Sequence, residues 1–320
     1  MTSNNYLESL EPNYFNMNLP FVTIGVLTYN SSEFIIETLE SIKAQTYPRL
    51  ILQISDDCST DNTIELCENW IEKNKERFEK TKIIVPDHNT GVSGNANRDW
   101  DACETEWLKE IAGDDLLMPN CIEDSLKFVE EHSDAILVFS KVRCFGVSKE
   151  RCKRHEERIF DYSFFNMSPD EQFERIKYAS CLPTTSAFYN ITKLRQYGLR
   201  HDERIPLLED RPKWLNAIRM GIKFHFFDKE TVLYRLHEES LSNTSILSPK
   251  FYESTRLAFF YYAFQKLYQK DQEDAIKEAV RLEMEQYKKL VNTRVARDKY
   301  YRLSVYRIID IFKRIVRRIK

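Results

Sequence analysis

Glycine is scarce in this sequence: only 7 of its 320 residues are glycine, about a third of the number that average usage would give. None of them falls into the spacing of a three-glycine dinucleotide loop or of a phosphate-binding loop that ends in Gly-Lys-Ser/Thr. These absences argue against a nicotinamide-dependent Rossmann enzyme and against a P-loop NTPase.

Paired cysteines and long apolar runs are missing too. The 7 cysteines are odd in number and never stand in C-x-x-C spacing, which disfavours a disulfide framework or a cysteine zinc site and favours a reducing compartment. Residues 1–11 contain neither a basic segment nor an apolar stretch, and no uninterrupted apolar run approaches the roughly 18 residues of a membrane span. We therefore expect a cytoplasmic protein without a transmembrane helix.

Charge is unevenly distributed along the chain. The formal net charge is −3, but residues 301–320 contain seven Lys or Arg against one Asp, so this tail carries +6 and the rest of the chain −9. A basic appendage on an acidic body indicates attachment to an anionic surface, whereas a nucleic-acid-binding domain would itself be basic. The sequence therefore predicts no nucleic-acid partner.

Residues 21–145 alternate short β-branched or aromatic runs with longer amphipathic stretches, which predicts βαβ units and a largely parallel sheet. The length of 320 residues allows roughly two domains. The predicted strands are 21–27, 50–54, 82–85, 107–111 and 135–139, and the predicted helices are 33–44, 63–77, 93–103 and 120–131.

The second half of the chain is less regular. The highly charged stretch 149–158 is expected to be a solvated loop or an insertion. Beyond it, the patterns predict a strand at 185–189, a helix at 211–220 closed by Gly221, strands at 223–227 and 231–236, and helix from residue 250 to the end. The predicted organisation is an N-terminal extension (1–20), an α/β domain (21–243) and a helical C-terminal region (244–320) with a basic tail.

Two acidic clusters follow predicted strands, at the carboxyl edge where open α/β sheets bind ligands. Asp57 lies in the cluster after the second strand, and Asp114 and Asp115 follow the fourth. Adjacent carboxylates repel each other, and a divalent cation that also holds a diphosphate relieves this repulsion. The alternative is that these aspartates cap helices and form turns, an interpretation that we favour for Asp61.

Several motifs occur in a fixed order along the chain: Val22–Asn30, Ser55–Asp61, Asn89-Thr90-Gly91 with Asn97, Asp114-Asp115 with Pro119, Glu209-Asp210, and Tyr234-Arg235-Leu236-His237. This ordered set resembles the inverting GT-A glycosyltransferases of family 2. The resemblance covers about residues 20–243. It implies a GT-A-like, Rossmann-related, mostly parallel sheet flanked by helices and followed by a C-terminal helical extension.

The resemblance also implies roles for single residues. Asp210 would take the proton from the acceptor hydroxyl, and Asp114 and His237 would hold Mn²⁺ or Mg²⁺ on the donor diphosphate. The residues implied in binding the nucleotide sugar are Thr28, Tyr29, Asn30, Asp57, Asn97, Arg98, Asp115 and Arg235. Two positions depart from the family pattern. Ala112 stands where the fullest acidic motif begins with Asp, and Ala96 stands where many members carry arginine.

Asp210 has a structural alternative, because it stands immediately before a predicted helix and could be its N-cap. Proline prefers the first helical position, so Pro212 predicts that Arg211 is the cap. Asp210 would then lie one residue outside the helix and point into a cleft. Glu209 is expected to support it.

The predicted function is metal-assisted, inverting transfer of a sugar from a nucleotide sugar, UDP-linked by family resemblance, to a hydroxyl of a glycan or lipid-linked glycan in surface polysaccharide (O-antigen or capsule) synthesis. Two alternatives stay open. A sugar-phosphate nucleotidyltransferase would show a glycine-rich opening loop, whereas Thr28-Tyr29-Asn30-Ser31 stands here. A catalytically silent, membrane-associated scaffold would keep the fold without the chemistry.

The basic tail places apolar residues at helical spacing from Val305 to Ile319, with Lys and Arg on much of the remaining surface. Such a helix can lie in a membrane interface, where each basic side chain contributes about 1 kcal/mol near anionic lipid. We expect peripheral attachment to the inner face of a membrane. The alternative is a helix packed on its own domain or on a second subunit of a homo-oligomer.

Overall fold

The structure, a computed structural model, describes residues 19–177, 180–205, 207–237 and 249–263, together with residues 277, 280, 281 and 284. The chain divides into two compact units, Met1–Leu236 and His237–Lys320. The predicted N-terminal extension and the basic amphipathic tail lie outside the described residues, apart from residues 19 and 20.

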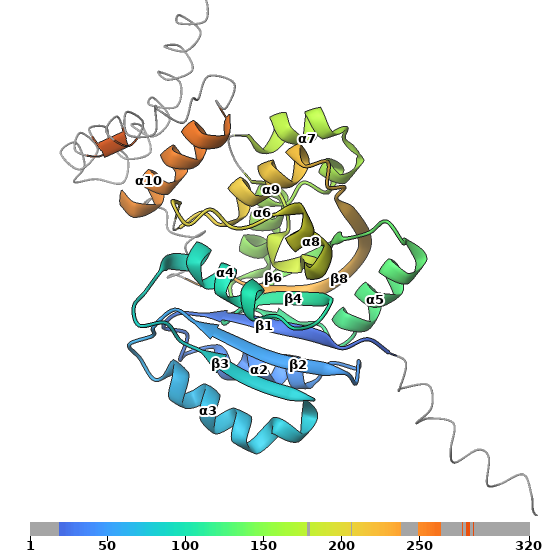
Figure 1. Cartoon of the computed structure of the whole chain (residues 1–320), viewed down its shortest axis with the longest axis vertical. Helices are drawn as coiled ribbons and strands as arrows, with labels where there is room; N and C mark the ends of the chain where they lie inside the picture. Colours follow the sequence, from blue (N-terminus) through green and yellow to red (C-terminus); the bar gives the residue numbers. More distant parts are fainter. Residues whose placement is uncertain are drawn as a thin grey trace, which may run out of the picture. The chain divides into compact units, whose positions relative to one another are not determined.

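The strands that the structure describes in the first unit form one mixed sheet. Its strands are β1 (Val22–Thr28), β2 (Leu50–Asp56), β3 (Lys80–Ile84), β4 (Trp107–Ala112), β5 (Leu116–Leu117), β6 (Leu137–Phe145), β7 (Phe188–Asn190) and β8 (His225–Arg235). Their order in the sheet is β3-β2-β1-β4-β7-β6-β8-β5 (Figure 1). The neighbours β3, β2, β1 and β4 are parallel, which confirms the predicted βαβ arrangement. Strand β7 is antiparallel to both β4 and β6.

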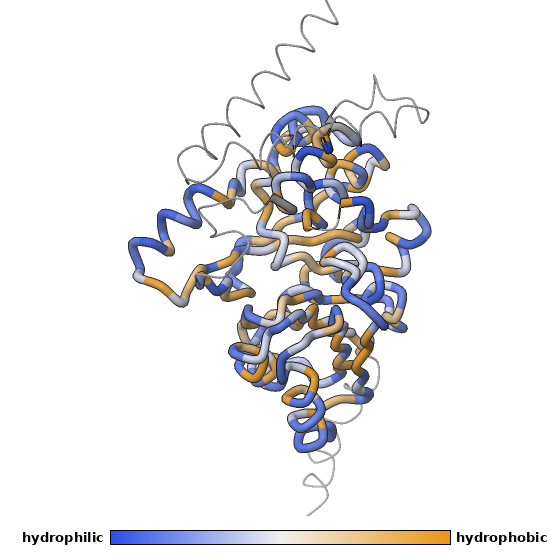
Figure 2. Tube along the Cα trace, turned by 90° about the vertical axis from the view of Figure 1, so that its left-hand side faces the viewer, coloured by the Kyte–Doolittle hydropathy of each residue, from blue (hydrophilic) through white to orange (hydrophobic). Residues whose placement is uncertain are grey.

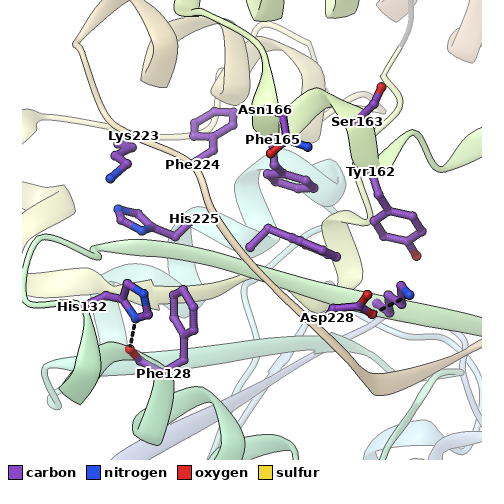
Figure 3. A pocket seen from close by; sticks show the side chains of 12 residues that line it. Phe128, His132, Tyr162, Ser163, Phe165, Asn166, Lys223, Phe224, His225 and Asp228 are labelled. Carbon is purple, nitrogen blue, oxygen red and sulfur yellow. Dashed lines mark hydrogen bonds and ion pairs between the residues drawn. The ribbon is translucent and has the colours of Figure 1, made fainter.

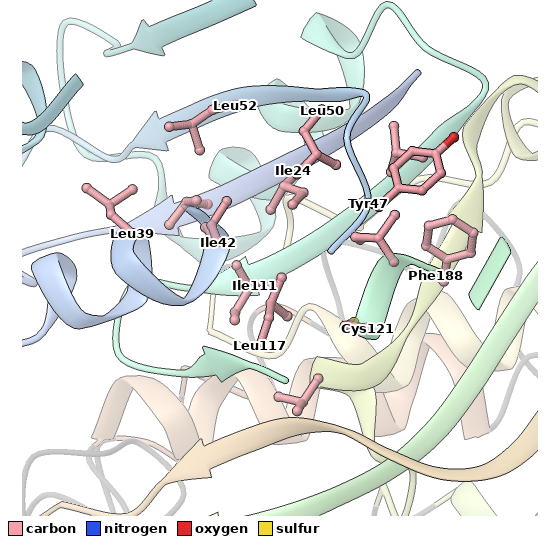
Figure 4. Close-up of a cluster of buried hydrophobic side chains, with 14 of the residues drawn as sticks. Ile24, Leu39, Ile42, Tyr47, Leu50, Leu52, Ile111, Leu117, Cys121 and Phe188 are labelled. Atoms are coloured by element: carbon pink, nitrogen blue, oxygen red, sulfur yellow. The ribbon is translucent and has the colours of Figure 1, made fainter. Parts of the chain in front are cut away.

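Helices cover both faces of the parallel strands. On one face, Ile24 and Leu52 pack with Leu39 and Ile42 of α2 (Ile35–Lys43), and α3 (Thr63–Asn74) joins the same core (Figure 4). Successive side chains of a strand point to opposite faces, so Gly25 faces the other side, where α4 (Gly91–Ala102) lies. Figure 2 shows hydrophobic segments running through the middle of the trace and hydrophilic residues at many of its outer turns.

Gly25 allows α4 to approach the sheet closely. A Cβ atom at this position would lie 2.1 Å from Oδ2 of Asp99, which is fully buried on α4. Gly25 pairs in register with Gln53 on β2 and with Glu110 on β4. The centre of this face is therefore a row of polar side chains packed under one helix.

Gly25→Ala is expected to lower the free energy of unfolding by about 1–3 kcal/mol, the usual cost of overpacking a core. Urea unfolding measures this change. In an Asp99→Ala background the same substitution should cost less, because the clashing carboxylate is gone. An equal cost in both backgrounds would contradict the close contact.

The second half of the first unit corrects three predictions. Residues 149–158 do not form a loop, because Lys149–Ile159 is the helix α6, which the side chain of Ser148 caps by accepting a hydrogen bond from the Arg151 amide. The two predicted strands at 223–227 and 231–236 are one long strand, β8, parallel to β6. The predicted strand at 185–189 begins instead as a short 3-10 turn, η3 (Thr184–Ser186), followed by β7.

The helix predicted at 63–77 ends as α3 at Asn74 and continues as a 3-10 turn, η1 (Lys75–Arg77). Three further elements had no prediction: η2 (Tyr162–Asn166), α7 (Pro169–Ile176) and α8 (Ile191–Tyr197). Two of them carry clear end signals. A capping box of Ser168 and Glu171 begins α7, and Gly198 ends α8 with a left-handed φ of 71°. The predicted helices at 120–131 and 211–220 are confirmed as α5 (Cys121–Glu131) and α9 (Asp210–Arg219).

In the second unit, the described residues include α10 (Pro249–Ala258) and a π-helical turn, Phe259–Ala263. This confirms the predicted helix over those residues. Of the helices that the structure describes, none combines the length and the apolar character that crossing a membrane requires.

Candidate functional site

Hydrogen bonds that involve side chains join the turns that follow β1 and β2. Asn30 has a positive φ of 51°, unusual for a residue other than glycine. Its amide donates to Oγ of Ser59 at 2.8 Å, and its Oδ1 accepts from the Thr60 amide at 2.8 Å. Tyr29, the residue before it, is 50% exposed. These bonds therefore place an exposed aromatic ring at the carboxyl edge of the sheet, and the predicted contact of Tyr29 with the nucleotide sugar stays a prediction.

Thr28 joins this first turn to the neighbouring strands. Its Oγ1 donates to Oδ2 of the buried Asp56 at 2.7 Å, and its carbonyl oxygen accepts from the Asp57 amide at 2.9 Å. On the other side, a Cβ at Gly113 would lie 2.9 Å from Cγ2 of Thr28. The two acidic turns predicted from the sequence therefore meet at the end of β1.

Asp57 connects β2 to the start of α4. Its Oδ1 accepts from the amide and the hydroxyl of Thr90, at 3.0 and 2.7 Å, and its Oδ2 accepts from the Gly91 amide at 2.8 Å. Arg98 donates from Nη2 to the same Oδ1 at 3.3 Å. With the side chain only 2% exposed, Asp57 holds the loop before α4 and orients Arg98. Its predicted contact with the nucleotide sugar stays a prediction.

The side chain of Asn97 forms its hydrogen bonds with a different segment, residues 201–203. Its Nδ2 donates to the His201 carbonyl at 3.0 Å and to Oε1 of Glu203 at 2.7 Å, while its Oδ1 accepts from the His201 amide at 3.0 Å. The side chain is 3% exposed. Asn97 thus attaches α4 to residues 201–203, and its predicted role in binding the donor stays a prediction.

The second acidic turn, after β4, is held by β8. The Arg235 amide donates to Oδ1 of Asp115 at 2.9 Å, and Nε of Arg235 donates to the Asp114 carbonyl at 2.8 Å. The guanidinium also donates to Glu37 and lies over the rings of Phe34 and Phe145. Arg235 and Asp114 are therefore brought together at one edge of the sheet, as predicted.

Asp115 faces inward and is 1% exposed. Burial, and then the neighbouring charge of Asp114, raise the pKa of Asp115 well above its usual value. Besides the bond from Arg235, its Oδ2 accepts from Oγ1 of Thr185 at 2.8 Å. Asp115 thus anchors the turn to η3, and its predicted contact with the donor stays a prediction.

The short turn η3 links the acidic turn to the predicted base. Thr184 and Thr185 are consecutive residues: Thr185 donates to Asp115, and Oγ1 of Thr184 donates to Oδ2 of Asp210 at 3.4 Å. Sequence reasoning missed both threonines, because it began a strand at Thr185 and gave Thr184 no assignment. The feature of the sequence that could have revealed them is the polar run Thr184-Thr185-Ser186. Through it the structure brings Asp210 to the same region as the two acidic turns.

Asp210 is the first residue of α9, and Glu209 is the N-cap residue, without a side-chain capping bond. The prediction that Arg211 caps the helix and leaves Asp210 outside is therefore wrong. Instead, Pro212 occupies the third position of the first turn, where a missing amide proton also leaves no helical bond broken. Oδ1 of Asp210 accepts from the Arg211 amide at 2.6 Å. Burial and the adjacent Asp210 raise the pKa of Glu209 to about 7.

The donor set at the second acidic turn suits a hard cation that shares its ligands with phosphate. In the part of the chain that the structure describes, no three His, Cys, Asp or Glu side chains gather as a self-sufficient metal site. Mg²⁺ and similar cations use one or two carboxylates together with phosphate oxygens, so Asp114 fits that requirement only with a bound diphosphate. His237 begins the second unit, and its predicted metal contact stays a prediction.

A separate cavity of about 610 Å³ lies among α5, η2 and the start of β8. Tyr162, Phe165 and Phe224 form one wall in Figure 3, and Phe128 and His132 lie on the other. None of the predicted site residues lines this cavity. The sequence-predicted site is the convergence of turns at the sheet edge.

Comparisons with known proteins identify the sequence family. The model described as "Glycosyl transferase family 2" matches residues 23–197. The poly(ribitol-phosphate) beta-N-acetylglucosaminyltransferase TarS of Staphylococcus aureus is 28% identical over 245 residues, 73% of this chain and 39% of that protein. The putative teichuronic acid biosynthesis glycosyltransferase TuaG of Bacillus subtilis is 23% identical over 251 residues, 78% of this chain and 90% of that protein. This chain thus spans about two fifths of the length of TarS.

Solved structures share the fold at lower identity. Residues 1–349 of S. aureus TarS, in complex with UDP-GlcNAc, superpose with a TM-score of 0.57 at 20% identity, covering 80% of this chain and 70% of that one. The mannosyltransferase PcManGT from Pyrobaculum calidifontis, in complex with GDP-Man and Mn²⁺, superposes with a TM-score of 0.56 at 15% identity, covering 89% and 74%. These likenesses confirm the GT-A-like sheet flanked by helices.

Proposed function

The chain belongs to glycosyl transferase family 2, and we propose that it transfers a sugar from a UDP-linked donor to a hydroxyl of a glycan or lipid-linked glycan during surface polysaccharide assembly. One observation carries this proposal: Thr184 and Thr185 tie Asp210 and the acidic turn of Asp114-Asp115 to one short element. Family membership disfavours both alternatives, the nucleotidyltransferase and the silent scaffold. The bound UDP-GlcNAc of the TarS structure supports the choice of nucleotide.

The donor would lie along the carboxyl edge of β1, β2 and β4. Tyr29 offers an exposed ring for the base, and Asn30 and Asp57 fix the two turns that frame it. Asp114 and Arg235 would face the diphosphate, where negative charge develops as the leaving group departs. A Mn²⁺ or Mg²⁺ ion held by Asp114 would stabilise that charge as a Lewis acid, with His237 as a further proposed ligand.

Asp210 would supply the proton acceptor. In an inverting displacement the acceptor oxygen attacks the anomeric carbon from the side opposite the leaving group, and its proton must pass to a nearby base. The carboxylate of Asp210 reaches Thr184 at the wall of the site, and proton transfer to a positioned side chain contributes about 10²–10⁴ in rate. The acceptor hydroxyl would therefore approach between α9 and the acidic turns.

UDP with Mn²⁺ is expected to raise the melting temperature of the protein by about 5–10 °C at a hundredfold excess over the dissociation constant, because a ligand that binds only the folded state stabilises it. A thermal-shift series with UDP, GDP, Mn²⁺ and EDTA measures this effect. Asp114→Asn should remove the metal-dependent part of the shift. Equal stabilisation by UDP with Mn²⁺ and with EDTA would contradict the proposed metal role.

The proposed attachment to anionic membranes rests on residues 305–320 of the sequence. Vesicles that contain phosphatidylglycerol are expected to sediment the full chain, less so as salt is raised, because screening weakens attraction to the basic side chains. The matched control is the chain without residues 301–320. Equal sedimentation of the two chains would exclude the tail as the anchor, and a dimer lost with the same deletion would indicate the subunit-packing alternative.

A further inference from the structure

A buried lysine lies one turn beyond the proposed base. Lys213 of α9 is 1% exposed, and its Nζ donates to the Tyr189 hydroxyl at 3.1 Å. The ammonium lies 5.3, 5.0 and 4.3 Å from the ring centroids of Trp100, Tyr189 and Trp214. Aromatic faces attract a cation, but burying an ammonium is costly unless negative charge accompanies it. The surroundings of Lys213 must therefore supply that charge.

Three carboxyl groups supply it. Glu209 and Asp210 precede Lys213 by four and three positions, the spacing that places helical side chains on one face, and Glu110 faces it from β4. Burial lowers the pKa of Lys213, and the charges of Glu110, Glu209 and Asp210 oppose that change. In return, Lys213 lowers the pKa of Glu110 and of Glu209 against the effect of burial. Lys213 is thus a cation that these groups share, and Lys109 also lowers the pKa of Glu110.

The other titratable groups around Lys213 contribute little charge. Nε2 of His201 lies 3.4 Å from Nζ of Lys213, and burial together with Lys213 lowers the pKa of His201 well below its usual value, so this ring is neutral. Burial raises the pKa of Tyr189 and keeps its hydroxyl protonated. On α4, burial and Glu110 raise the pKa of Asp99 well above its usual value, which favours the neutral form of this side chain.

We propose that Lys213 is a positioning residue for sugar transfer: its ammonium, fixed by aromatic rings from α4, β7 and α9, balances the negative charge of Glu110 and Glu209 beside Asp210. This inference rests on the proposed role of Asp210 as the base. Without the ammonium, Glu110, Glu209 and Asp210 would repel one another in a buried region. The pKa of Glu209, already raised to about 7, would then rise further, and a proton held at the start of α9 would compete with the proton that the acceptor hydroxyl must release.

Two substitutions shift the charge in opposite directions. Lys213→Met removes the cation and keeps the length of the side chain, so the acidic limb of the pH–rate profile should move up by about one unit, which is about tenfold in rate on that limb. Glu110→Gln removes a competing carboxylate, so the same limb should move to lower pH. Lys213→Arg keeps the charge and can stack on the rings, so its limb should stay near that of the wild type.

The test measures UDP release from UDP-GlcNAc between pH 5 and 9, with the exposed Lys193→Met on α8 as the matched control. A purely structural role of Lys213 would lower the rate equally at every pH, and an unmoved limb in both Lys213→Met and Glu110→Gln would overturn the proposal. If Lys213→Met does not fold, Glu110→Gln alone decides, because its amide keeps the shape of the side chain.

A second readout separates this proposal from the proposed function. Carboxyls with a raised pKa in the folded state bind protons that the unfolded chain has released, so their stabilising effect is present at low pH and is lost as pH rises. In Lys213→Met the free energy of unfolding should therefore fall more steeply between pH 5 and 8 than in the wild type. Parallel curves would overturn the charge role even if UDP-GlcNAc proves not to be a substrate, whereas absent UDP release alone would count against the proposed function.

Discussion

Asp210→Asn is expected to lower the rate of sugar transfer at saturating substrates by a factor of about 10²–10⁴, the usual contribution of a positioned general base. The amide keeps the shape of the side chain: its oxygen can still accept from the Arg211 amide, and its nitrogen can donate to the Thr184 hydroxyl, but it cannot take the acceptor proton. Asp210 contacts η3 and its own helix, and the donor is proposed to lie along β1, β2 and β4. The affinity for UDP, measured by calorimetry, should therefore change by less than about threefold.

Glu209→Gln is the matched control for that experiment. The pKa of Glu209 is raised to about 7, so this side chain becomes neutral as pH falls through 7, and glutamine mimics its neutral form. The substitution should leave the rate at pH 6 nearly unchanged and alter it mainly above pH 7. If Glu209→Gln abolished transfer while Asp210→Asn kept more than a tenth of the activity, the base would be Glu209 and our assignment would be wrong.

The sequence predicted the parallel half of the fold because each element there carries its own signal. The strands β1 to β4 are short apolar runs, and each of the intervening helices has an amphipathic face. Since the carboxyl ends of parallel strands share one edge of a sheet, the positions of Asp57 and Asp114 in the sequence already predicted that their turns would meet. Thr28, which contacts the neighbours of both, shows that they do.

The helix α6 was not predicted because tertiary contacts, which the local pattern does not contain, determine its burial. Its composition is almost entirely charged, and only Cys152 and His155 are buried. Cys152 packs with Cys144 of β6 and with Leu236, residues that are adjacent only in the folded protein. From sequence alone a polar segment of this kind is assigned to a loop, because the hydrophobic surface that its apolar face packs against is formed only in the folded protein.

The sequence also could not reveal how the site residues divide their hydrogen bonds. Asn97 and Asp115 occupy the positions that the family resemblance implies, but both are buried and bonded to residues 201–203 and to η3. The link from η3 to Asp210 depends on an antiparallel strand, β7, inserted between β4 and β6. A sequence pattern gives the order of such elements along the chain but not their order in the sheet.

Asp57→Ala is expected to lower the free energy of unfolding by about 2–4 kcal/mol, a large effect for a turn residue, because it removes four hydrogen bonds from a nearly buried carboxylate. The Thr90 amide would lose its acceptor, the Gly91 amide at the start of α4 would keep only Oδ1 of Asn89, and the guanidinium of Arg98 would lose a paired charge. Urea unfolding measures the loss. The same contacts orient the loop and Arg98, so the affinity for UDP should also fall. We expect a loss of about tenfold, which corresponds to about 1.4 kcal/mol of binding free energy.

Asp61→Ala provides the comparison, because Asp61 lies in the same loop but binds elsewhere. It accepts hydrogen bonds from Ser32 and Thr63 at the start of α3, and those bonds hold the pKa of Asp61 below its usual value despite partial burial. Losing these hydrogen bonds should cost about 1 kcal/mol and leave the affinity for UDP unchanged. If both substitutions weakened UDP binding equally, the loop would act as one structural unit, and Asp57 would have no separate part in forming the donor site.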